Sequence, residues 1–492
     1  MAAPFRLYNT LTRRVEPFEP VKPGHVGIYC CGMTVYDDCH AGHARAFIIF
    51  DAFVRRLRAR GWSVRFVRNY TDVDDKIIHR ANERGEDPAA LADRYVAAFA
   101  RDAAALGLAP PDAEPRVTTS MDDIVAMIER LVGQGHAYAV DGNVWFAVRT
   151  APRYGQLSGQ AVDALGSSAD PDSGKRDPLD FALWKSARAG DPSWPSPWGP
   201  GRPGWHIECS AMAARHLGET IDIHGGGLDL VFPHHENEVA QSECAHGARF
   251  SNWFMHNGLL TMPGGRKMGK SEGNAFTVVD LTAAWPAEAI RLYYLQNHYR
   301  SPLAWTPDSI AESLAMLDRL VEAREVASRM TGDGEAARLL TDLGADAAEV
   351  WRLGNAFEAA FHAALDDDFN TAAALGLAFE LARAVNRFAN HKRAAAVGAP
   401  VVAPALRALA LLPPHLGLLQ TDVGTWQAEL AAKVLPRRGT SANAVDALVA
   451  DRTAARNGRD WARADALRTE LDALGIAVMD RDGHTTWRVR VT

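Results

Sequence analysis

One short segment of the sequence carries side chains suited to binding a polyphosphate. Residues 40–43 read His-Ala-Gly-His, and two imidazoles three residues apart can reach the same phosphate chain. Gly42 between them lets a ligand approach the backbone, and a helix beginning here would offer free N–H groups and a positive dipole end. Taken alone, the segment fits a zinc-binding pair or two surface histidines as well. His40 and His43 therefore need a second segment to make the phosphate interpretation specific.

That second segment is a lysine loop. Residues 267–271 read Lys-Met-Gly-Lys-Ser and follow the glycine-rich approach at 263–265. Two ammonium groups on a mobile loop can close over a transferring phosphoryl group and offset the charge that develops there. In isolation, a solvated basic turn explains such a loop equally well. The two segments, more than two hundred residues apart, are together similar to the signature of class I aminoacyl-tRNA synthetases.

A third group of residues has the composition of a zinc site. Residues 233–238 (Pro-His-His-Glu-Asn-Glu) should open a helix, so that His234 and Glu238 share one face. Cys31 follows the first predicted strand, and Cys209 supplies a second thiol. Two cysteines, one histidine and one carboxylate are a suitable donor set for Zn²⁺. Each residue by itself fits the core or the surface too.

A parallel sheet is the element that could position these residues. The chain alternates strand, helix and strand over 26–30, 44–58 and 63–69, which is how a parallel α/β sheet begins. The sheet should resume near Trp205 and continue through 221–224. The predicted fold class is therefore α/β, with a Rossmann-type parallel-sheet domain that carries an insertion and is followed by a helical bundle. The resemblance to class I aminoacyl-tRNA synthetases implies that the sheet domain is catalytic and that a small C-terminal anticodon-binding domain follows the bundle.

Changes in composition and in predicted secondary structure along the chain indicate the domain organisation. A predicted helix at 121–132 and a strand at 144–148 lead into five prolines within 192–203, which exclude a helix or a central strand there. After Ser309 an amphipathic pattern indicates helices. The predicted boundaries are 1–115 with 205–260 for the catalytic domain, 116–204 for the insertion, 261–308 for a connecting region with the lysine loop, 309–400 for the bundle and 401–492 for the C-terminal region.

The composition is that of an ordinary globular protein. The chain has 492 residues, about three domain lengths, with 47% hydrophobic and 23% charged residues. Its 53 basic and 60 acidic residues give a net charge of -7, which excludes a uniformly basic nucleic-acid coat but not a local basic patch. Five cysteines are too few for a disulfide framework, and we find no run of the ~18 apolar residues that spans a bilayer. We expect a soluble, cytoplasmic protein with free thiols and no membrane partner.

Longer segments make the likeness to one family specific. The sequence resembles the cysteinyl-tRNA synthetase family over nearly its whole length, at residues 31–37, 69–77, 205–210, 224–229, 232–238, 267–271, 366–371 and 460–465. The resemblance implies zinc binding by Cys31, Cys209, His234 and Glu238, with Cys31 and not its neighbour Cys30 as the first ligand. Two positions depart from the family pattern, since Ala41 replaces isoleucine and Gly269 replaces serine.

The resemblance also implies a reaction and its participants. L-Cysteine would react with ATP to give cysteinyl-adenylate, and the acyl group would then pass to the terminal ribose of cysteine tRNA. The implied cofactors are one Zn²⁺ per chain and Mg²⁺ with the ATP, and the implied oligomeric state is a monomer. The implied roles are catalysis for His40, His43, Lys267 and Lys270, ATP binding for Gly42, Gly227, Asp229 and Lys270, and amino-acid binding for Thr71 and Trp205.

Zinc would explain how such an enzyme selects its amino acid. Cysteine and serine differ by one atom, and a hydrophobic pocket cannot separate close isosteres by the factor of about 10⁴ that translation needs. Zn²⁺ binds a thiolate directly, whereas a neutral hydroxyl competes poorly. We therefore expect a zinc ion that receives the substrate thiol, and no separate editing domain, for which the inserted segment of about ninety residues is too short.

The C-terminal region has the charge expected of an RNA-binding module. Residues 433–492 contain 11 Lys+Arg and 8 Asp+Glu, a balance of +3 against -7 for the whole chain. Arginines at 452, 456, 459 and 463 follow a helical spacing and predict a basic stripe on one helix face. The resemblance implies anticodon binding here, and the candidate tRNA-binding residues are Arg456, Trp461, Asp465 and Asp480. Trp461 could stack on a base or belong to the core.

Three other functions fit part of the pattern. A related ligase joins cysteine to an amino-sugar acceptor in mycothiol biosynthesis, but that family lacks the long C-terminal RNA module. A nucleotidyltransferase with the same histidine segment would not explain the Cys/His/Glu set. A non-catalytic zinc protein that binds RNA would not explain His40, His43 and Lys270. The prediction is therefore a ligase whose partners are cysteine tRNA, L-cysteine and ATP.

Overall fold

A four-stranded parallel sheet forms the centre of the catalytic region. The computed structural model describes residues 4–161, 174–262, 264, 276–481 and 484–491. The prediction of an α/β fold with a parallel sheet is confirmed, because all neighbouring strands of this sheet run in the same direction. Their carboxyl ends therefore meet at one edge, where ligand sites of such sheets lie. The strand order is β10-β9-β3-β4, with β3 at His25–Thr34, β4 at Ser63–Thr71, β9 at Ile221–Gly227 and β10 at Ser251–Asn257.

Helix α1 (Ala41–Ala59) connects β3 to β4, as the sequence pattern predicts. Its apolar side chains, such as Phe50 and Phe53, are buried in the core. In its last turn the buried Arg56 donates to Asp366 of α11 (Ala345–Asp366) at 2.5 Å. The helix thus begins at the carboxyl edge of the sheet and ends against the helical bundle.

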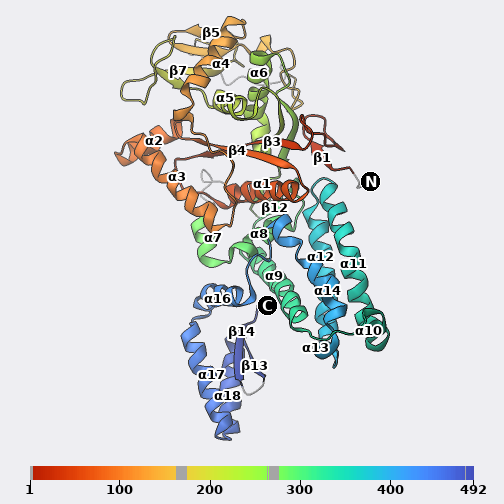
Figure 1. Cartoon of the computed structure of the whole chain (residues 1–492). Coiled ribbons are helices and arrows are strands. Elements are labelled where there is room, and N and C mark those ends of the chain that lie inside the picture. Colours follow the sequence, from red (N-terminus) through yellow and green to blue (C-terminus); the bar gives the residue numbers. More distant parts are fainter. Residues whose placement is uncertain (1–3, 162–173, 263, 265–275, 482–483, 492) are drawn as a thin grey trace.

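A second sheet, antiparallel, lies within the predicted insertion. Its order is β5-β6-β7-β8, and α4 (Met121–Gly133) precedes it in the chain. Figure 1 shows this sheet stacked above the parallel sheet, with α5 between the two and α6 beside α4. The proline-rich segment contributes only the edge strand β8, as expected for residues that cannot complete a central ladder. The strand bounds are β5 at Ala137–Val140, β6 at Asn143–Phe146, β7 at Phe181–Ser186 and β8 at Gly201–Pro203.

Two helices beneath the insertion carry part of the candidate site. Helix α5 spans Trp205–Leu217 and α6 spans Glu236–His246. A π-type turn at Val231–His235 precedes α6, whose regular part begins at Glu236. Phe232 has extended dihedral angles (φ -137°, ψ 133°) and His235 is already helical, so the break in the chain falls just before Pro233, where the sequence predicts that the helix begins.

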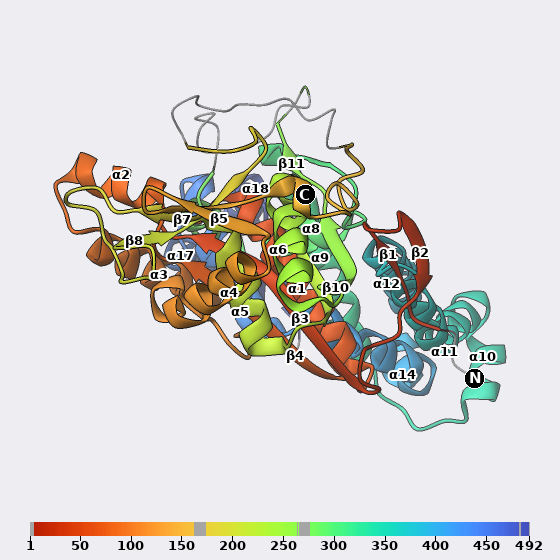
Figure 2. The same ribbon diagram turned by 90° about the horizontal axis from the view of Figure 1, so that it is seen from above.

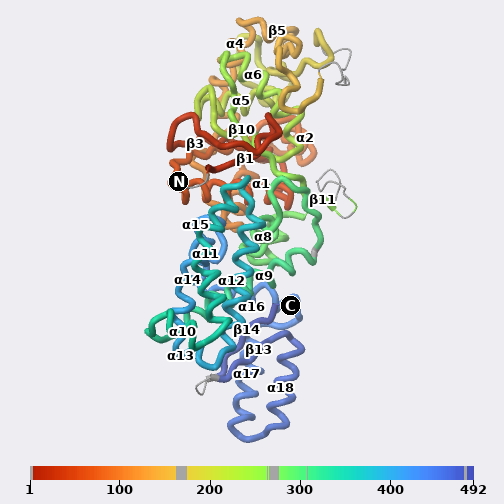
Figure 3. Tube along the Cα trace, turned by 90° about the vertical axis from the view of Figure 1, so that its right-hand side faces the viewer, coloured from red at the N-terminus to blue at the C-terminus, as the bar shows by residue number. Residues whose placement is uncertain are grey.

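The C-terminal part of the chain is mostly helical. Helices α9 (Pro307–Arg329), α11, α12 (Thr371–Ala389) and α14 (Ala399–Leu409) form the bundle. Figure 3 shows the last module, with α17 and α18, at the end of the molecule opposite the insertion. Its strand β14 (His484–Val489) is tied to the bundle by Arg488, which donates to Asp318 of α9 at 3.0 Å. The other elements of this module are α17 at Ala442–Asn457, α18 at Trp461–Ala473 and β13 at Ile476–Arg481.

The N-terminal hairpin packs on the bundle. Viewed from above, β1 and β2 lie beside α12, on the opposite side of the molecule from α2 (Figure 2). The backbone N–H of Tyr8 donates to Asp368 at the α11–α12 junction, at 2.8 Å. The remaining elements are β1 at Arg6–Asn9, β2 at Arg14–Pro17, α2 at Asp75–Arg84, α3 at Pro88–Ala105, β11 at Leu260–Thr261, α7 at Val278–Ala284, α8 at Ala287–Leu295, β12 at Leu303–Ala304, α10 at Ala336–Leu343, α13 at Ala394–Val397, α15 at Leu412–Leu416 and α16 at Val423–Val434.

One segment has the length and apolar composition of a membrane span. It covers Ala399–Leu416, and half of it is buried inside the structure. This differs from the sequence-based expectation that the chain has no such run. The segment is shared by α14 and α15, and its side chains include Val401 and Leu412, which are completely buried in the bundle core.

Candidate active site

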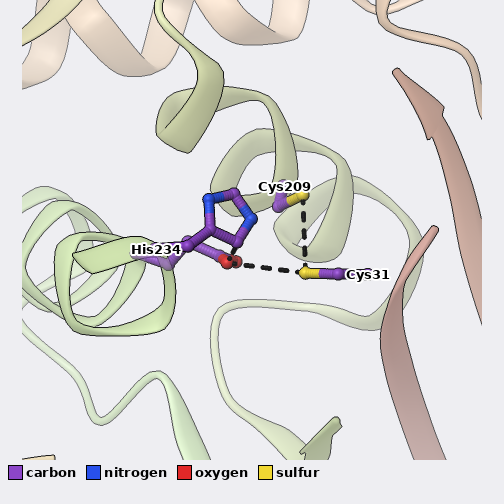
Figure 4. A group of neighbouring side chains, drawn as sticks. Cys31, Cys209 and His234 are labelled. Carbon is purple, nitrogen blue, oxygen red and sulfur yellow. Dashed lines mark hydrogen bonds and ion pairs between the residues drawn. The ribbon is translucent and has the colours of Figure 1, made fainter. Parts of the chain in front are cut away.

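Four side chains converge from β3, α5, the π-type turn and α6. The potential ligand atoms of Cys31, Cys209, His234 and Glu238 all lie within 4.8 Å of one another. The two Sγ atoms are 3.8 Å apart, and Glu238 Oε1 is 3.6 Å from Cys31 Sγ and 3.1 Å from His234 Nε2. Figure 4 shows the two sulfur atoms and the imidazole turned toward one another. The structure thus brings all four predicted ligands together, in a group that we call the metal quartet.

The geometry of the quartet fits a zinc ion. Tetrahedral Zn²⁺ with Zn–S bonds of about 2.3 Å holds two thiolates about 3.8 Å apart, which matches the Cys31–Cys209 separation. Burial, followed by contact with Cys209, raises the pKa of the Cys31 thiol well above its usual value. Acidic groups packed this closely away from water need a cation to be stable in ionised form. The donor set is therefore suitable for Zn²⁺.

Other histidines surround the quartet. Cys31, His224, His235 and Glu238 also have ligand atoms within 4.8 Å of one another. We prefer the first group because its two thiolates suit a soft metal better than one. In addition, His206 Nδ1 lies 2.8 Å from Nδ1 of His234, the kind of contact that orients a metal-binding imidazole.

Sequence reasoning assigned no role to His206, His224 or His235. All three lie in the segments that carry the family resemblance, at 205–210, 224–229 and 232–238. Their place in those segments was the one feature of the sequence that could have indicated a role for them. Nothing in the spacing of the sequence indicates that His224 and His235 lie 3.0 and 4.0 Å from the Glu238 carboxylate, or that His206 contacts His234.

A bulge in β3 presents Cys31 to the site. The pairing of β3 with β4 shifts register between Cys30 and Met33. At Gly32, a Cβ atom would lie only 1.6 Å from the carbonyl oxygen of Asn69, so only glycine fits. Burial raises the pKa of Cys30 to about 12, which keeps that thiol protonated inside the core. The local backbone therefore favours Cys31 over Cys30 as a ligand.

The two predicted amino-acid-binding residues lie beside the quartet. The Trp205 indole stacks on the His234 ring with 4.1 Å between centroids, and 37% of the residue is exposed. Thr71, the last residue of β4, donates from Oγ1 to Glu208 Oε2 at 3.2 Å. Burial, and then the nearby Cys209 and Asp74, raise the pKa of Glu208 well above the usual value. Sequence reasoning gave Glu208 no role.

The histidine segment forms the start of α1. His40 is the N-cap residue, and its Nδ1 accepts hydrogen bonds from the backbone N–H groups of Gly42 (3.1 Å) and His43 (3.4 Å). The rings of His40 and His43 stack with 3.7 Å between centroids. The helix N–H groups that the sequence offered to a phosphate are therefore engaged by His40 itself. Phosphate binding here would rest on the two imidazoles.

The lysine loop ends next to the histidine segment. Lys267, Gly269 and Lys270 lie outside the described residues. The chain returns at Phe276, whose carbonyl accepts from the N–H of Ala41 at 2.8 Å, and the N–H of Val278 donates to the Cys39 carbonyl at 2.8 Å. These bonds attach the downstream end of the lysine loop to the start of α1.

The predicted ribose contacts lie at the same edge of the sheet. Gly227 is the last residue of β9, and Asp229 follows in an exposed turn at Leu228–Leu230. A Cβ atom on Gly227 would lie 2.5 Å from Asp229 Oδ1, so a larger residue would displace that carboxylate. The glycine and the carboxylate are thus placed together.

The candidate RNA-binding residues differ in their exposure and in their ion pairs. Trp461, in the first turn of α18, is 59% exposed, and Asp465 on the same helix is exposed too. Asp480 accepts from Arg452 at 2.8 Å and from Arg456, and the bond from Arg452 is the main reason why the pKa of Asp480 lies below its usual range. The placement of Trp461 excludes the core alternative.

The predicted basic stripe is wrong. Helix α17 ends at Asn457, and Arg459 has a left-handed backbone conformation (φ 61°) that a continuing helix cannot contain. Arg463 therefore belongs to α18, and Arg452 is buried against Asp480. The four arginines do not share one helix face.

Comparison with known proteins covers the whole chain. Residues 17–315 match the family of class I tRNA synthetases (C), catalytic domain, residues 360–420 match the DALR domain, and residues 440–488 match the cysteinyl-tRNA ligase anticodon binding domain. The cysteine–tRNA ligase of Alkalilimnicola ehrlichii is 51% identical over 485 residues, which cover 98% of this chain and 99% of that relative. That of Halorhodospira halophila is 49% identical over 487 residues, with the same coverage.

The chain belongs to the cysteine–tRNA ligase family. Known structures agree with the class I fold of this ligase. Methionyl-tRNA synthetase from Mycobacterium tuberculosis, in complex with methionyl-adenylate, superposes with a TM-score of 0.61 at 15% identity and covers 85% of this chain and 94% of its own. A putative arginyl-tRNA synthetase from Campylobacter jejuni gives a TM-score of 0.51 at 13% identity, covering 86% and 94%. Identities this low bear on the fold alone.

Proposed function

We propose that this ligase activates L-cysteine with ATP and transfers it to the terminal ribose of cysteine tRNA. Full-length similarity to cysteine–tRNA ligases supports the overall reaction. The observation that carries the choice of amino acid is the metal quartet, in which the two thiols lie 3.8 Å apart beside Trp205. The quartet would hold one Zn²⁺ per chain.

In the first step the cysteine carboxylate attacks the α-phosphorus of ATP and pyrophosphate leaves. His40 and His43, stacked at the start of α1, would contact the triphosphate, and Lys267 and Lys270 would offset the charge that moves onto the leaving group. Gly42, Gly227 and Asp229 would hold the nucleotide, and Mg²⁺ would accompany it. Correct placement of the two reactants supplies much of the rate enhancement.

Selection of the thiol would depend on the residues around the quartet. When bound, Zn²⁺ supplies a soft Lewis acid that prefers a thiolate to a hydroxyl. His206 holds the His234 ring by its other nitrogen, and Trp205 covers the opposite side of that ring. These contacts would hold the His234 ring in the orientation that lets its Nε2 act as a ligand.

In the second step a ribose hydroxyl of the tRNA attacks the adenylate carbonyl, and AMP leaves. Anticodon reading would fall to Arg456, Trp461, Asp465 and Asp480. The ligase would act as a cytoplasmic monomer. Its catalytic domain would comprise 1–115 and 205–260, with 116–204 inserted, 261–308 connecting, 309–400 as the bundle and 401–492 as the anticodon-binding region.

An amino-sugar acceptor is not favoured. The match of residues 440–488 to an anticodon binding domain supports a tRNA acceptor instead. The deciding experiment is a charging assay with zinc-loaded protein, ATP, and either cysteine tRNA or the amino-sugar glycoside. We expect cysteinylation of the tRNA alone, and pyrophosphate exchange with cysteine but not with serine. Equal exchange with serine would contradict the role of the quartet.

A further inference from the structure

Glu208 is a buried carboxyl group without a strong partner. Only 1% of the residue is exposed. Within the part of the chain that the structure describes, the Thr71 hydroxyl at 3.2 Å is its only hydrogen-bond donor. The charged groups with the largest influence on it are acidic, namely Cys209, Asp74 and Asp72. Among the described residues, then, no basic side chain neutralises this carboxylate.

The neighbouring acids are already satisfied. Asp72 accepts from the backbone N–H of Thr118 at 3.0 Å and from its hydroxyl at 2.6 Å. Asp74 caps helix α2 by accepting from the N–H of Lys76 at 2.9 Å. These two carboxylates have structural tasks, whereas the single neutral donor of Glu208 leaves most of its hydrogen-bonding capacity unused.

Glu236 provides a useful contrast within the same part of the molecule. It is completely buried, and its two oxygens accept from the backbone N–H groups of Gly155 (2.8 Å) and Ser158 (2.7 Å). A buried carboxylate is costly unless hydrogen bonds or a cation compensate the loss of water. Glu236 has that compensation from the protein, and Glu208 does not.

Glu208 is connected to the quartet through Thr71 and Asn69. It precedes the proposed ligand Cys209 and shares Thr71 with the amino-acid pocket. Asn69 continues the contact, because its Nδ2 lies 3.4 Å from Thr71 Oγ1 and its Oδ1 lies 3.9 Å from Cys209 Sγ. The ammonium nitrogen of cysteine is three bonds from its sulfur. A molecule whose thiol lies at the quartet therefore has its one cationic group within the reach of this side of the pocket.

We propose that Glu208 receives the α-ammonium group of the cysteine substrate, with Thr71 holding the carboxylate in place. This inference rests on the proposed function and adds a second point of recognition to it. The quartet would bind the thiol, and Glu208 would bind the ammonium group. The pair would reject thiols that have no neighbouring ammonium group. Charge-assisted hydrogen bonds in such sites contribute about 10- to 100-fold in affinity.

The test uses Glu208→Gln and three ligands. The amide keeps the shape and an oxygen acceptor for Thr71 but removes the charge. Calorimetric titration of the zinc-loaded protein compares cysteine, cysteamine, which lacks the carboxylate, and 3-mercaptopropionate, which lacks the amine. We expect the Kd of cysteine and of cysteamine to rise about 10- to 100-fold and that of 3-mercaptopropionate to stay unchanged. Equal weakening of all three ligands, or of none, overturns the proposal.

Matched measurements separate this role from a structural one. Zinc content and Tm of Glu208→Gln should equal those of the wild type. Glu236→Gln, which alters an equally buried carboxylate, should not discriminate between the three ligands. If Glu208→Gln does not fold, Glu208→Asp keeps the charge on a shorter stem and should lose cysteamine affinity selectively; uniform loss there counts against the proposal.

The outcome also separates this inference from the proposed function. If the wild-type protein binds neither cysteine nor 3-mercaptopropionate, the thiol-selecting quartet itself is wrong. If the wild type binds both and Glu208→Gln binds them equally well, the quartet stands and only the role of Glu208 fails.

Discussion

The amino-acid site and the RNA module hold their polar side chains in opposite ways. At the quartet, His234 and Glu238 are 1% and 0% exposed, and each contacts other members of the group. In the C-terminal module, Trp461 is 59% exposed, and Asp480 remains partly exposed while it pairs with arginines. In the first region the side chains are buried and contact one another. In the second region they are exposed to solvent.

The difference fits what we propose that each region recognises. A small polar substrate is distinguished by removing it from water and surrounding it with fixed groups. An unstacked RNA base is read by aromatic stacking and by hydrogen bonds along its edges, which requires accessible side chains. We therefore expect mutations in the quartet to abolish its chemistry together, and mutations in the RNA module to act in separate, smaller steps.

The largest effect should come from Cys31→Ser. Loss of one soft ligand should empty the quartet and reduce cysteine-dependent pyrophosphate exchange by about 10³-fold or more, since metal affinity depends on the complete donor set. Zinc content by elemental analysis and exchange kinetics measure this. Cys30→Ser is the matched control, because it changes the adjacent buried thiol outside the quartet and should retain zinc. Retention of zinc by Cys31→Ser would contradict the expectation that the members of the quartet depend on one another.

The next largest effect should come from Trp461→Ala. Loss of a stacking surface worth about 1–3 kcal/mol should lower kcat/KM for tRNA charging roughly 5- to 150-fold. Pyrophosphate exchange and Tm should not change, because the indole is exposed and lies in a different module from the quartet. Trp461→Phe should restore most of the charging rate. A fall in Tm with normal charging would instead indicate a structural tryptophan.

A smaller effect is expected for Asp480→Asn. The charged partner of Arg452 and Arg456 is lost, so both guanidinium groups become less well oriented. Partly exposed ion pairs contribute up to about 1 kcal/mol, so charging should fall by at most about 5-fold. The comparison with Asp465→Asn, an exposed carboxylate in the same module, sharpens the result. An unchanged charging rate for Asp480→Asn would show that the ion pairs of Asp480 with Arg452 and Arg456 do not contribute to RNA recognition.

A further effect, on stability and not on charging, concerns pH at the junction of α1 with the bundle. Burial, and then Arg56, lower the pKa of His415 to about 4. An unfolded histidine titrates near 6.5, so the unfolded chain binds more protons between pH 4 and 6.5. The free energy of unfolding should thus be highest above pH 6.5 and fall by on the order of 2 kcal/mol toward pH 4.

Denaturant titrations at several pH values measure this change. His415→Gln should flatten the profile over that range. The exposed His79, changed in the same way, should leave it unaltered. A profile for His415→Gln that matches the wild type would assign the acid sensitivity to other groups.

Much of the site could be predicted from residue types and spacing. The parallel strand–helix–strand unit and the position of the histidine segment at the start of α1 follow from patterns in the chain. Residue types made the four members of the quartet candidates, and the family resemblance implied them as a set. The choice between Cys30 and Cys31 rested on resemblance alone. Its physical reason, the bulge at Gly32, depends on a strand that comes later in the sequence.

Other features could not be predicted because long-range packing decides them. The shielding of Glu208 depends on β4 and α5 meeting at Thr71. The interrupted helix before Glu236 and the break at Arg459 depend on single backbone conformations that helix periodicity does not report. Likewise, the spacing of the arginines suggested one helix face, although a turn divides them between two helices.

Helix α1 has a mechanical consequence for the whole ligase. Its 19 residues form a rod about 28 Å long, with His40 at one end and the buried Arg56–Asp366 pair near the other. Because a helix resists compression and bending, a shift of the bundle would displace the His40 end of α1 as a rigid body. Inserting a single residue in this rod would rotate one end against the other by about 100°. The length of α1 therefore fixes how its two ends are oriented relative to each other.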